Sequence, residues 1–230
     1  MAGSPSTPSR PRVAAADGPR RGPRRTPSTA VTTRAAVFQA AAAAFSDRGF
    51  DGVGVDEIAA IAGVNKAMIY YHFTDKLELY LEVVRDMLRD ASVRVTAIAE
   101  SDRPAPLRLE TFIAAFVEMA DARPWFPTLM LREMAEGGPR LDPDTLVLMR
   151  SVFVAFARIV QEGQATGAFR SVNLVLAYMS TIGPLLLNAA RERAARQPGR
   201  SDLPMFVEVP HAVLAAHMQQ VALDMLRIKP

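Results

Sequence analysis

The stretch GVNKAMIYYHF, residues 63–73, decides the fold, because it reads as a tight turn that leads straight into a short helix. Gly63 suits the left-handed conformation in which many helices end. After Val64, Asn65 is a strong N-cap for the next helix. A turn of about three residues that contains glycine and joins two helices is the sequence form of a helix-turn-helix.

The helix that follows Asn65 has two unlike sides. Steps of about 100° per residue place Ile69 and Phe73 together, and we expect this side to pack against the preceding helices. The other positions are outward-facing Ala67, Met68 and Tyr71, intermediate Tyr70, and Lys66 at the N-terminal tip. Tyrosine hydroxyls and a lysine ammonium can bond phosphate oxygens, and alanine and methionine can contact thymine methyl groups, so the pattern favours DNA binding.

Two further apolar stripes precede this stretch. The nearer one recurs at offsets 0, 3, 4 and 7 and consists of Val55, Ile58, Ala59 and Ala62. An alanine-rich segment before it carries a stripe at offsets 0, 4, 7, 11 and 14 and stops at Gly49; its members are Val31, Ala35, Phe38, Ala42 and Phe45. We therefore expect an N-terminal domain of three helices over residues 30–78, with the helix-turn-helix at about 54–73.

The rest of the chain, residues 79–230, also reads as helical. Thr74 and Asp75 can cap a long helix that runs to about Ala99. Pro and Gly then divide the sequence into helices near 105–121, 124–136, 143–164, 172–195 and 209–227. No segment alternates in the manner of a strand, so we expect an all-α protein whose second domain is the larger one.

Residues 1–29 differ in composition from everything that follows. They are rich in Pro, Ser, Gly and Arg, and six arginines against Asp17 give them a net charge of +5. We expect a disordered tail, which is either without function or a basic arm on DNA phosphates. Because the whole chain carries +3, the remainder carries −2, and DNA binding by the folded part must rest on a small local patch.

The composition excludes several function classes. Without cysteine, the chain has no thiolate metal site, iron–sulfur cluster or cysteine nucleophile, and a reducing cytoplasm fits. It shows neither a secretory signal nor a run of about 18 apolar residues, so we expect a cytoplasmic protein without a membrane contact. His72, His211 and His217 lack metal-binding spacing, and the glycines of GFDGVGV, residues 49–55, lack a preceding strand. We expect no enzyme, no metal and no cofactor.

The run from Thr33 to Leu81 resembles the DNA-binding domain of the tetracycline-repressor (TetR) family of bacterial transcription regulators. The resemblance rests on Thr33-Arg34, Phe45, Gly49-Phe50, Ile58-Ala59, Ala62-Gly63-Val64, and Tyr70 to Phe73 followed by Lys76. It implies a homodimeric repressor that a small-molecule effector releases from a palindromic operator. It also implies that base edges are read by Lys66, Ala67, Met68 and Tyr71. Further DNA contacts, mainly to phosphates, would come from Thr33, Arg34, Gly54, Val55, Tyr70, His72 and Lys76.

Two positions depart from the family pattern. Members commonly carry Ser or Thr where this chain has Gly54, and Thr or Ser where it has Met68. Without a hydroxyl at Gly54, phosphate contact falls to the backbone N–H groups at the helix N-terminus. At Met68 an apolar contact replaces a hydrogen bond, so we expect an operator sequence unlike that of a typical member.

The resemblance also implies an effector cavity among the C-terminal helices, for a small apolar or cationic molecule. Its candidate lining is aromatic and rich in methionine: Phe116, Met119, Trp125, Phe126, Met130, Met134, Phe153, Phe156 and Tyr178. Polar groups could come from Glu118, Glu133, Thr181 or Asn188. The same apolar side chains could equally be ordinary core.

The last two helices carry apolar residues on more than one face, among them Val213, Leu214, Met218 and Val221. One core cannot cover all of these faces, which indicates a partner surface, and the resemblance implies a homodimer through both helices. A DNA-binding protein without an effector, whose C-terminal domain only dimerises, stays an alternative. An internal cavity connected to solvent would favour the effector-dependent regulator.

Overall fold

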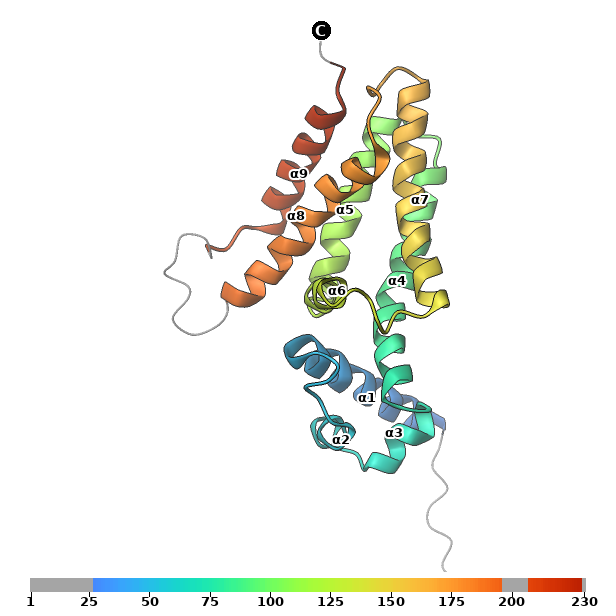
Figure 1. Cartoon of the computed structure of the whole chain (residues 1–230), viewed down its shortest axis with the longest axis vertical. Coiled ribbons are helices and arrows are strands. Elements are labelled where there is room, and N and C mark those ends of the chain that lie inside the picture. Colours follow the sequence, from blue (N-terminus) through green and yellow to red (C-terminus); the bar gives the residue numbers. More distant parts are fainter. Residues whose placement is uncertain (1–26, 196–206, 229–230) are drawn as a thin grey trace, which may run out of the picture.

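A computed structural model describes residues 27–195 and 207–228, and these form helices joined by turns and loops, without a strand (Figure 1). The helices are α1 (Pro27–Arg48), α2 (Val55–Ala62), α3 (Lys66–His72), α4 (Lys76–Glu100), α5 (Ala105–Ala122), α6 (Phe126–Ala135), α7 (Pro143–Ala165), α8 (Leu174–Ala195) and α9 (His211–Leu226). The all-α prediction is confirmed. The five helices from α5 onward lie within two residues of their predicted bounds, because Pro and Gly mark their ends.

The first helix begins earlier than the sequence predicts. Pro27 is its first residue, a position where the missing proline N–H costs nothing, since the first N–H groups of a helix have no partner. Residues 27–29 are therefore helical and not part of a tail. The rest of the predicted disordered tail, residues 1–26, lies outside the described residues.

The N-terminal helices α1, α2 and α3 share an apolar core with the first turns of α4 (Figure 1). Phe45, Ile58 and Ile69, one from each of the three helices, are fully buried. Tyr80 of α4 packs edge-on against Phe45, with ring centres 5.2 Å apart. The apolar side predicted for the third helix thus packs into a core that all four helices share.

The apolar stripe predicted for α1 is only partly right. Ala35 is exposed, and the buried side includes Val37 and Ala41. In an alanine-rich helix several faces are equally apolar, so periodicity does not fix which one packs. Phe38 is half-buried and meets Trp125 edge-on at 6.2 Å, because α1 also contacts α6.

The long helix α4 joins the two parts of the molecule. Oδ1 of Asp75 accepts a 2.8 Å hydrogen bond from the N–H of Glu78 and caps it. Its first turns pack on α1, and it contacts α5, α6 and α7 further along, as Figure 1 shows. One continuous helix therefore connects the N-terminal helices to the rest of the molecule.

The larger part of the molecule consists of α5 to α9, with α6 between this bundle and α1 (Figure 1). Within the described residues, α8 is the one helix whose length and composition would let it cross a membrane, a test that core helices of soluble proteins also pass. Here α8 buries Ala177, Ile182 and Leu185 inside the molecule. The predicted division of the chain near residue 78 stays a prediction.

Candidate nucleic-acid interface and cavities

The turn between α2 and α3 has the geometry that its sequence favours. Gly63 adopts φ 65° and ψ 33°, a left-handed conformation that glycine enters without a steric penalty. The N–H of Val64 donates to the carbonyl of Ala59 at 3.0 Å and closes the end of α2. The side chain of Asn65 accepts a 3.0 Å hydrogen bond from the N–H of Met68 and caps α3. The entry of the chain into α3 is therefore fixed on both sides of the turn.

The short helix α3 turns one side to solvent. Its exposed residues, which we name the outward face of α3, are Lys66, Ala67, Tyr70 and Tyr71. Tyr71 is 74% exposed, whereas Ile69 and Phe73 are buried as predicted. Met68 was predicted to face outward; it is half-buried, so we place it at the edge of the outward face.

The ammonium of Lys66 lies 2.9 Å from Oδ2 of Asp56, in the first turn of α2. The hydrogen bond to that carboxylate raises the pKa of Lys66. Because both side chains are exposed, water screens the pair, and the lysine can exchange this partner for a DNA group at little cost. A second exposed pair, Arg48 with Glu57 at 2.5 Å, lies nearby on α1 and α2.

Gly54 begins α2 without a side-chain cap. Its φ of −91° and ψ of 151° are open to any residue, and no atom lies within 4 Å of the position that a Cβ would take. The first N–H groups of α2, from the half-buried Val55 onward, thus have no side-chain acceptor at the cap and can bond a phosphate oxygen.

Thr33 and Arg34, both predicted at the DNA, contact the domain interior. Thr33 is buried. The guanidinium of Arg34 lies 3.3 Å from Oε2 of Glu82 and 5.0 Å from the centre of the Phe73 ring. These contacts fasten α1 to α3 and α4, so the two residues support the interface as the structure stands.

His72 is the last residue of α3, and Lys76 is the first residue of α4. The Nζ of Lys76 stands 4.2 Å from the centre of the Phe50 ring, in a cation–π contact. His72 is half-buried, and its ring meets that of Tyr71 edge-on at 5.0 Å. The structure therefore brings His72 beside the outward face and turns Lys76 toward α1.

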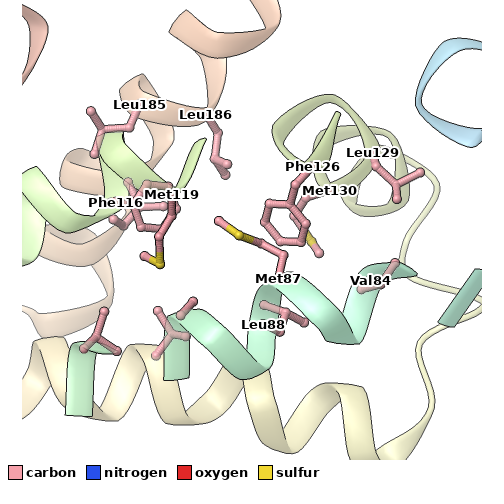
Figure 2. Packing of buried hydrophobic residues seen from close by; sticks show 14 of the residues in the cluster. Val84, Met87, Leu88, Phe116, Met119, Phe126, Leu129, Met130, Leu185 and Leu186 are labelled. Atoms are coloured by element: carbon pink, nitrogen blue, oxygen red, sulfur yellow. The ribbon is translucent and has the colours of Figure 1, made fainter. Parts of the chain in front are cut away.

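A cavity of about 470 Å³ lies among α4, α5, α6, α7 and α8. Six of the nine predicted residues line it: Phe116, Phe126, Met130, Met134, Phe153 and Tyr178. Figure 2 shows Phe116 of α5, Met87 of α4 and Phe126 of α6 pointing toward a common space. Methionine and aromatic residues of the C-terminal helices thus line a cavity as well as fill the core.

Three of the predicted residues do not line this cavity. Met119 and Phe156 are fully buried core residues. Trp125 lies at a second cavity of about 540 Å³, between α1 and the ends of α5, α8 and α9. Periodicity marks the side of a helix that packs, but it cannot tell which part of that packing is hollow.

The four polar side chains proposed for the cavity all lie elsewhere. Glu118 is exposed and pairs with Arg94 at 2.8 Å. Thr181 donates to a backbone carbonyl of its own helix, and Asn188 lines the second cavity. Glu133 is buried and bonds Tyr80 of α4 instead of lining the cavity. No Asp or Glu is among the lining residues, so a cation would find no counter-charge in this cavity.

Glu133 belongs to a buried polar cluster that the sequence did not reveal. Its Oε2 accepts a 2.6 Å hydrogen bond from the hydroxyl of Tyr80, and its Oε1 accepts one from the N–H of Arg140 at 3.1 Å. Arg140 also bonds Asp51, in the turn after α1, at 2.6 Å. Burial, and then the bond to Glu133, raises the pKa of Tyr80, so its phenol remains a donor. The cluster joins α4 and α6 to the N-terminal helices.

The helix-turn-helix region and the whole chain both match known transcription regulators. A family model described as bacterial regulatory proteins, tetR family, matches residues 37–83, from α1 into α4. The repressor BepR of Brucella suis biovar 1 is 32% identical over 155 residues, which cover 64% of this chain and 74% of BepR. The regulator TtgR of Pseudomonas putida is 27% identical over 218 residues, covering 90% and 97% of the two chains.

Solved structures show the same fold. The ketosteroid regulator KstR2 of Mycobacterium tuberculosis superposes with a TM-score of 0.70 at 20% identity, over 85% of this chain and 95% of KstR2. PfmR of Thermus thermophilus gives 0.65 at 22% identity, over 82% and 97% of the two chains. Taken with the identity to BepR, these matches show that the chain belongs to the TetR family and is a helix-turn-helix DNA-binding regulator of transcription.

Proposed function

We propose that this chain is a repressor that binds a palindromic operator as a homodimer in the cytoplasm and leaves it when a small apolar molecule fills the 470 Å³ cavity. The observation that carries the proposal is the position of α6. This helix contributes Met130 and Met134 to the cavity wall. One turn after Met130, the same helix carries Glu133, which bonds Tyr80 and Arg140 and through Arg140 is joined to Asp51.

Operator recognition would use the outward face of α3. Lys66 and Tyr71 project from it, and the half-buried Met68 offers an apolar contact at its edge. Recognition helices place their N-terminal residues against base edges in the major groove, which suits Lys66 and Ala67. Phosphate contacts would come from Tyr70, from His72 and from the uncapped N-terminus of α2.

Release would follow from a shift between two arrangements of α6. A ligand changes the equilibrium only if it binds the DNA-incompetent arrangement more tightly. A molecule between Met130 and α4 would displace α6, and Glu133 could then keep its bonds only if Tyr80 and Arg140 moved with it. Whether these bonds break or Tyr80 and Arg140 move with α6, the spacing or the orientation of the two α3 helices in a dimer would change.

The dimer would form through α8 and α9, which lie side by side at one edge of the molecule (Figure 1). Both helices leave large apolar side chains in solvent: Leu176, Met179, Leu187, Val213 and Val221. Exposed large apolar side chains on two neighbouring helices support a protein interface there. A twofold axis along this surface would present two copies of α3 on one side of a DNA duplex.

The alternative, an effector-independent DNA-binding protein, predicts a filled C-terminal core. The cavity argues against it, because its volume lies within the range of small-molecule sites, about 300–1,000 Å³. Its apolar lining from five helices also gives a ligand the contacts it needs to move one of them.

The experiment uses the full chain and a DNA site selected from random sequence. Fluorescence anisotropy would follow the complex while 1-octanol, a small neutral apolar probe, is added. The proposal expects dissociation that saturates with probe concentration, and a complex that octanol leaves intact at saturating binding would refute effector release. A Met130→Trp variant, which fills the cavity, should lose the response to octanol.

A further inference from the structure

The residues that line the 470 Å³ cavity include a single charged one, Arg150 on α7, which is itself exposed to solvent. Every other lining residue is apolar or glycine, except for the hydroxyl of Tyr178 on α8. A cavity wall of this kind suits a ligand that is apolar along most of its length and polar at one end. The chemistry of that end follows from the partners of the two polar groups.

Arg150 differs from the other arginines of residues 27–195 and 207–228. Each of the others makes an ion pair or a hydrogen bond to the protein; on the same helix, Arg158 bonds Glu162 at 2.9 Å and Glu100 at 3.3 Å. Within these ranges Arg150 has no such partner, although it borders an apolar wall that includes Met149 and Phe153. Because Arg150 is exposed and lines the cavity, its guanidinium donors are available where the cavity meets solvent.

The hydroxyl of Tyr178 is available in the same way. Its ring is held edge-on by Phe153, at 5.3 Å, and by Phe156, at 5.4 Å. No hydrogen bond joins its hydroxyl to the part of the chain that the structure describes. Burial raises the pKa of Tyr178 to about 12, so near neutral pH the hydroxyl keeps its proton and can donate. Phe153 lies one helical turn from Arg150 and in contact with Tyr178, so both donors border the same stretch of wall.

We propose that the effector is an aliphatic monocarboxylate, whose chain lies among the methionines of the cavity and whose carboxylate binds Arg150 with Tyr178 as a second donor. This assignment rests on the proposed function of the cavity. Arginine matches a carboxylate with two parallel hydrogen bonds, which makes it the preferred partner of that group. An ammonium head group would be repelled by the positive charge of Arg150, and it would find no carboxylate partner among the lining residues. Both effects disfavour it.

The apolar part of the wall suits a flexible chain. Met87, Met130, Met134, Met149 and Met179 all line the cavity. Methionine is unbranched and adjusts its shape to irregular neighbours, so chains of different length can be accommodated. Selectivity would therefore come from the head group more than from the length of the chain.

The test compares three probes of equal length, octanoate, 1-octanol and octylamine, by calorimetry on the full chain. Octanoate should bind at least about tenfold more tightly than octanol, the ratio expected for a charge-assisted hydrogen bond, and octylamine should bind most weakly. In Arg150→Gln the advantage of octanoate should disappear while octanol binding stays the same. Arg158→Gln removes an arginine from the same helix but away from the cavity wall, and this variant should keep the advantage of octanoate.

Equal binding of octanoate and octanol would overturn the assignment, as would preference for octylamine, an unchanged ratio in Arg150→Gln, or no binding by any probe. Thermal unfolding should be the same for Arg150→Gln and the wild type, because among the described residues Arg150 has no hydrogen-bond or ion-pair partner to lose. Operator release is a separate readout. If octanoate binds through Arg150 and the operator stays bound, the ligand assignment stands and effector release fails.

Discussion

The hydroxyl of Tyr80 on α4 donates a 2.6 Å hydrogen bond to Oε2 of Glu133 on α6, and both side chains are buried. The pair links α4, the helix that follows α3, to α6, which contributes residues to the cavity wall. Arg140 extends the link, since it bonds both Glu133 and Asp51. This chain of bonds is one polar connection between the cavity wall and the N-terminal helices, beside the bonds that Arg132 of α6 and Arg193 of α8 make to Asp47 of α1.

Tyr80→Phe should uncouple the effector from the operator. The change removes one hydrogen bond and leaves a buried carboxylate with fewer donors, at a cost of about 1–3 kcal/mol in the free energy of unfolding. The measured quantity is the ratio of operator affinities with and without effector, which we expect to approach one. Arg94→Gln, which breaks the exposed pair with Glu118, should leave that ratio unchanged. Full effector response in Tyr80→Phe would exclude this route.

Tyr71→Ala should weaken operator binding without loss of stability. Tyr71 is 74% exposed, so its removal should change the free energy of unfolding by no more than about 0.5 kcal/mol. Ile69→Ala, two residues away but fully buried, should cost about 2–5 kcal/mol. Thermal unfolding and operator titration of both variants would check this. A stability loss in Tyr71→Ala with intact DNA binding would place Tyr71 in the core.

Gly54→Ser should strengthen operator binding and stabilise α2 by a few tenths of a kcal/mol. Serine can adopt the extended conformation of Gly54, meets no atom there, and supplies both a cap and a phosphate donor. Gly63→Ser is the matched control, because its surroundings are equally open but its φ is 65°. That variant should be less stable than the wild type. Weaker DNA binding in Gly54→Ser would show that DNA approaches this residue too closely for a side chain.

Leu187→Glu should dissociate the dimer. Leu187 is 65% exposed on α8, and a charge there would be buried without a partner in the proposed interface. Light scattering after size exclusion would give the mass of the particle in solution. Val93→Glu, a change at a 71% exposed position on α4, serves as the control and should stay dimeric. A dimeric Leu187→Glu would move the interface away from this part of α8.

The N-terminal helices could be predicted from the sequence because their signals are local. Gly63 and Asn65 act on their own turn, and the spacing of Ile69 and Phe73 sets the buried side of a short helix. Met68 was harder to place, since it lies close to the border between the two sides and only the packed domain decides its exposure. For the same reason an alanine-rich α1 did not disclose which of its faces packs.

The C-terminal site was less predictable because it depends on long-range packing. Tyr80 and Glu133 are 53 residues apart in sequence, and neither stands in a pattern that reveals the other. The sequence offered Glu118 and Glu133 among the candidate polar groups of the cavity, yet these two bond Arg94 and Tyr80. No sequence pattern pointed to Arg150. It differs from the other described arginines only in having no ion-pair or hydrogen-bond partner among the described residues.

The central claim, that the outward face of α3 and its edge residue Met68 read the operator, has one direct test. Binding sites are selected from random DNA in parallel by the wild type and by Met68→Thr. The account predicts an inverted repeat for both proteins, with half-sites about one helical turn or more apart, and a base preference that differs at one or two positions of each half-site. The same motif from both proteins, or no motif from the wild type, would contradict it.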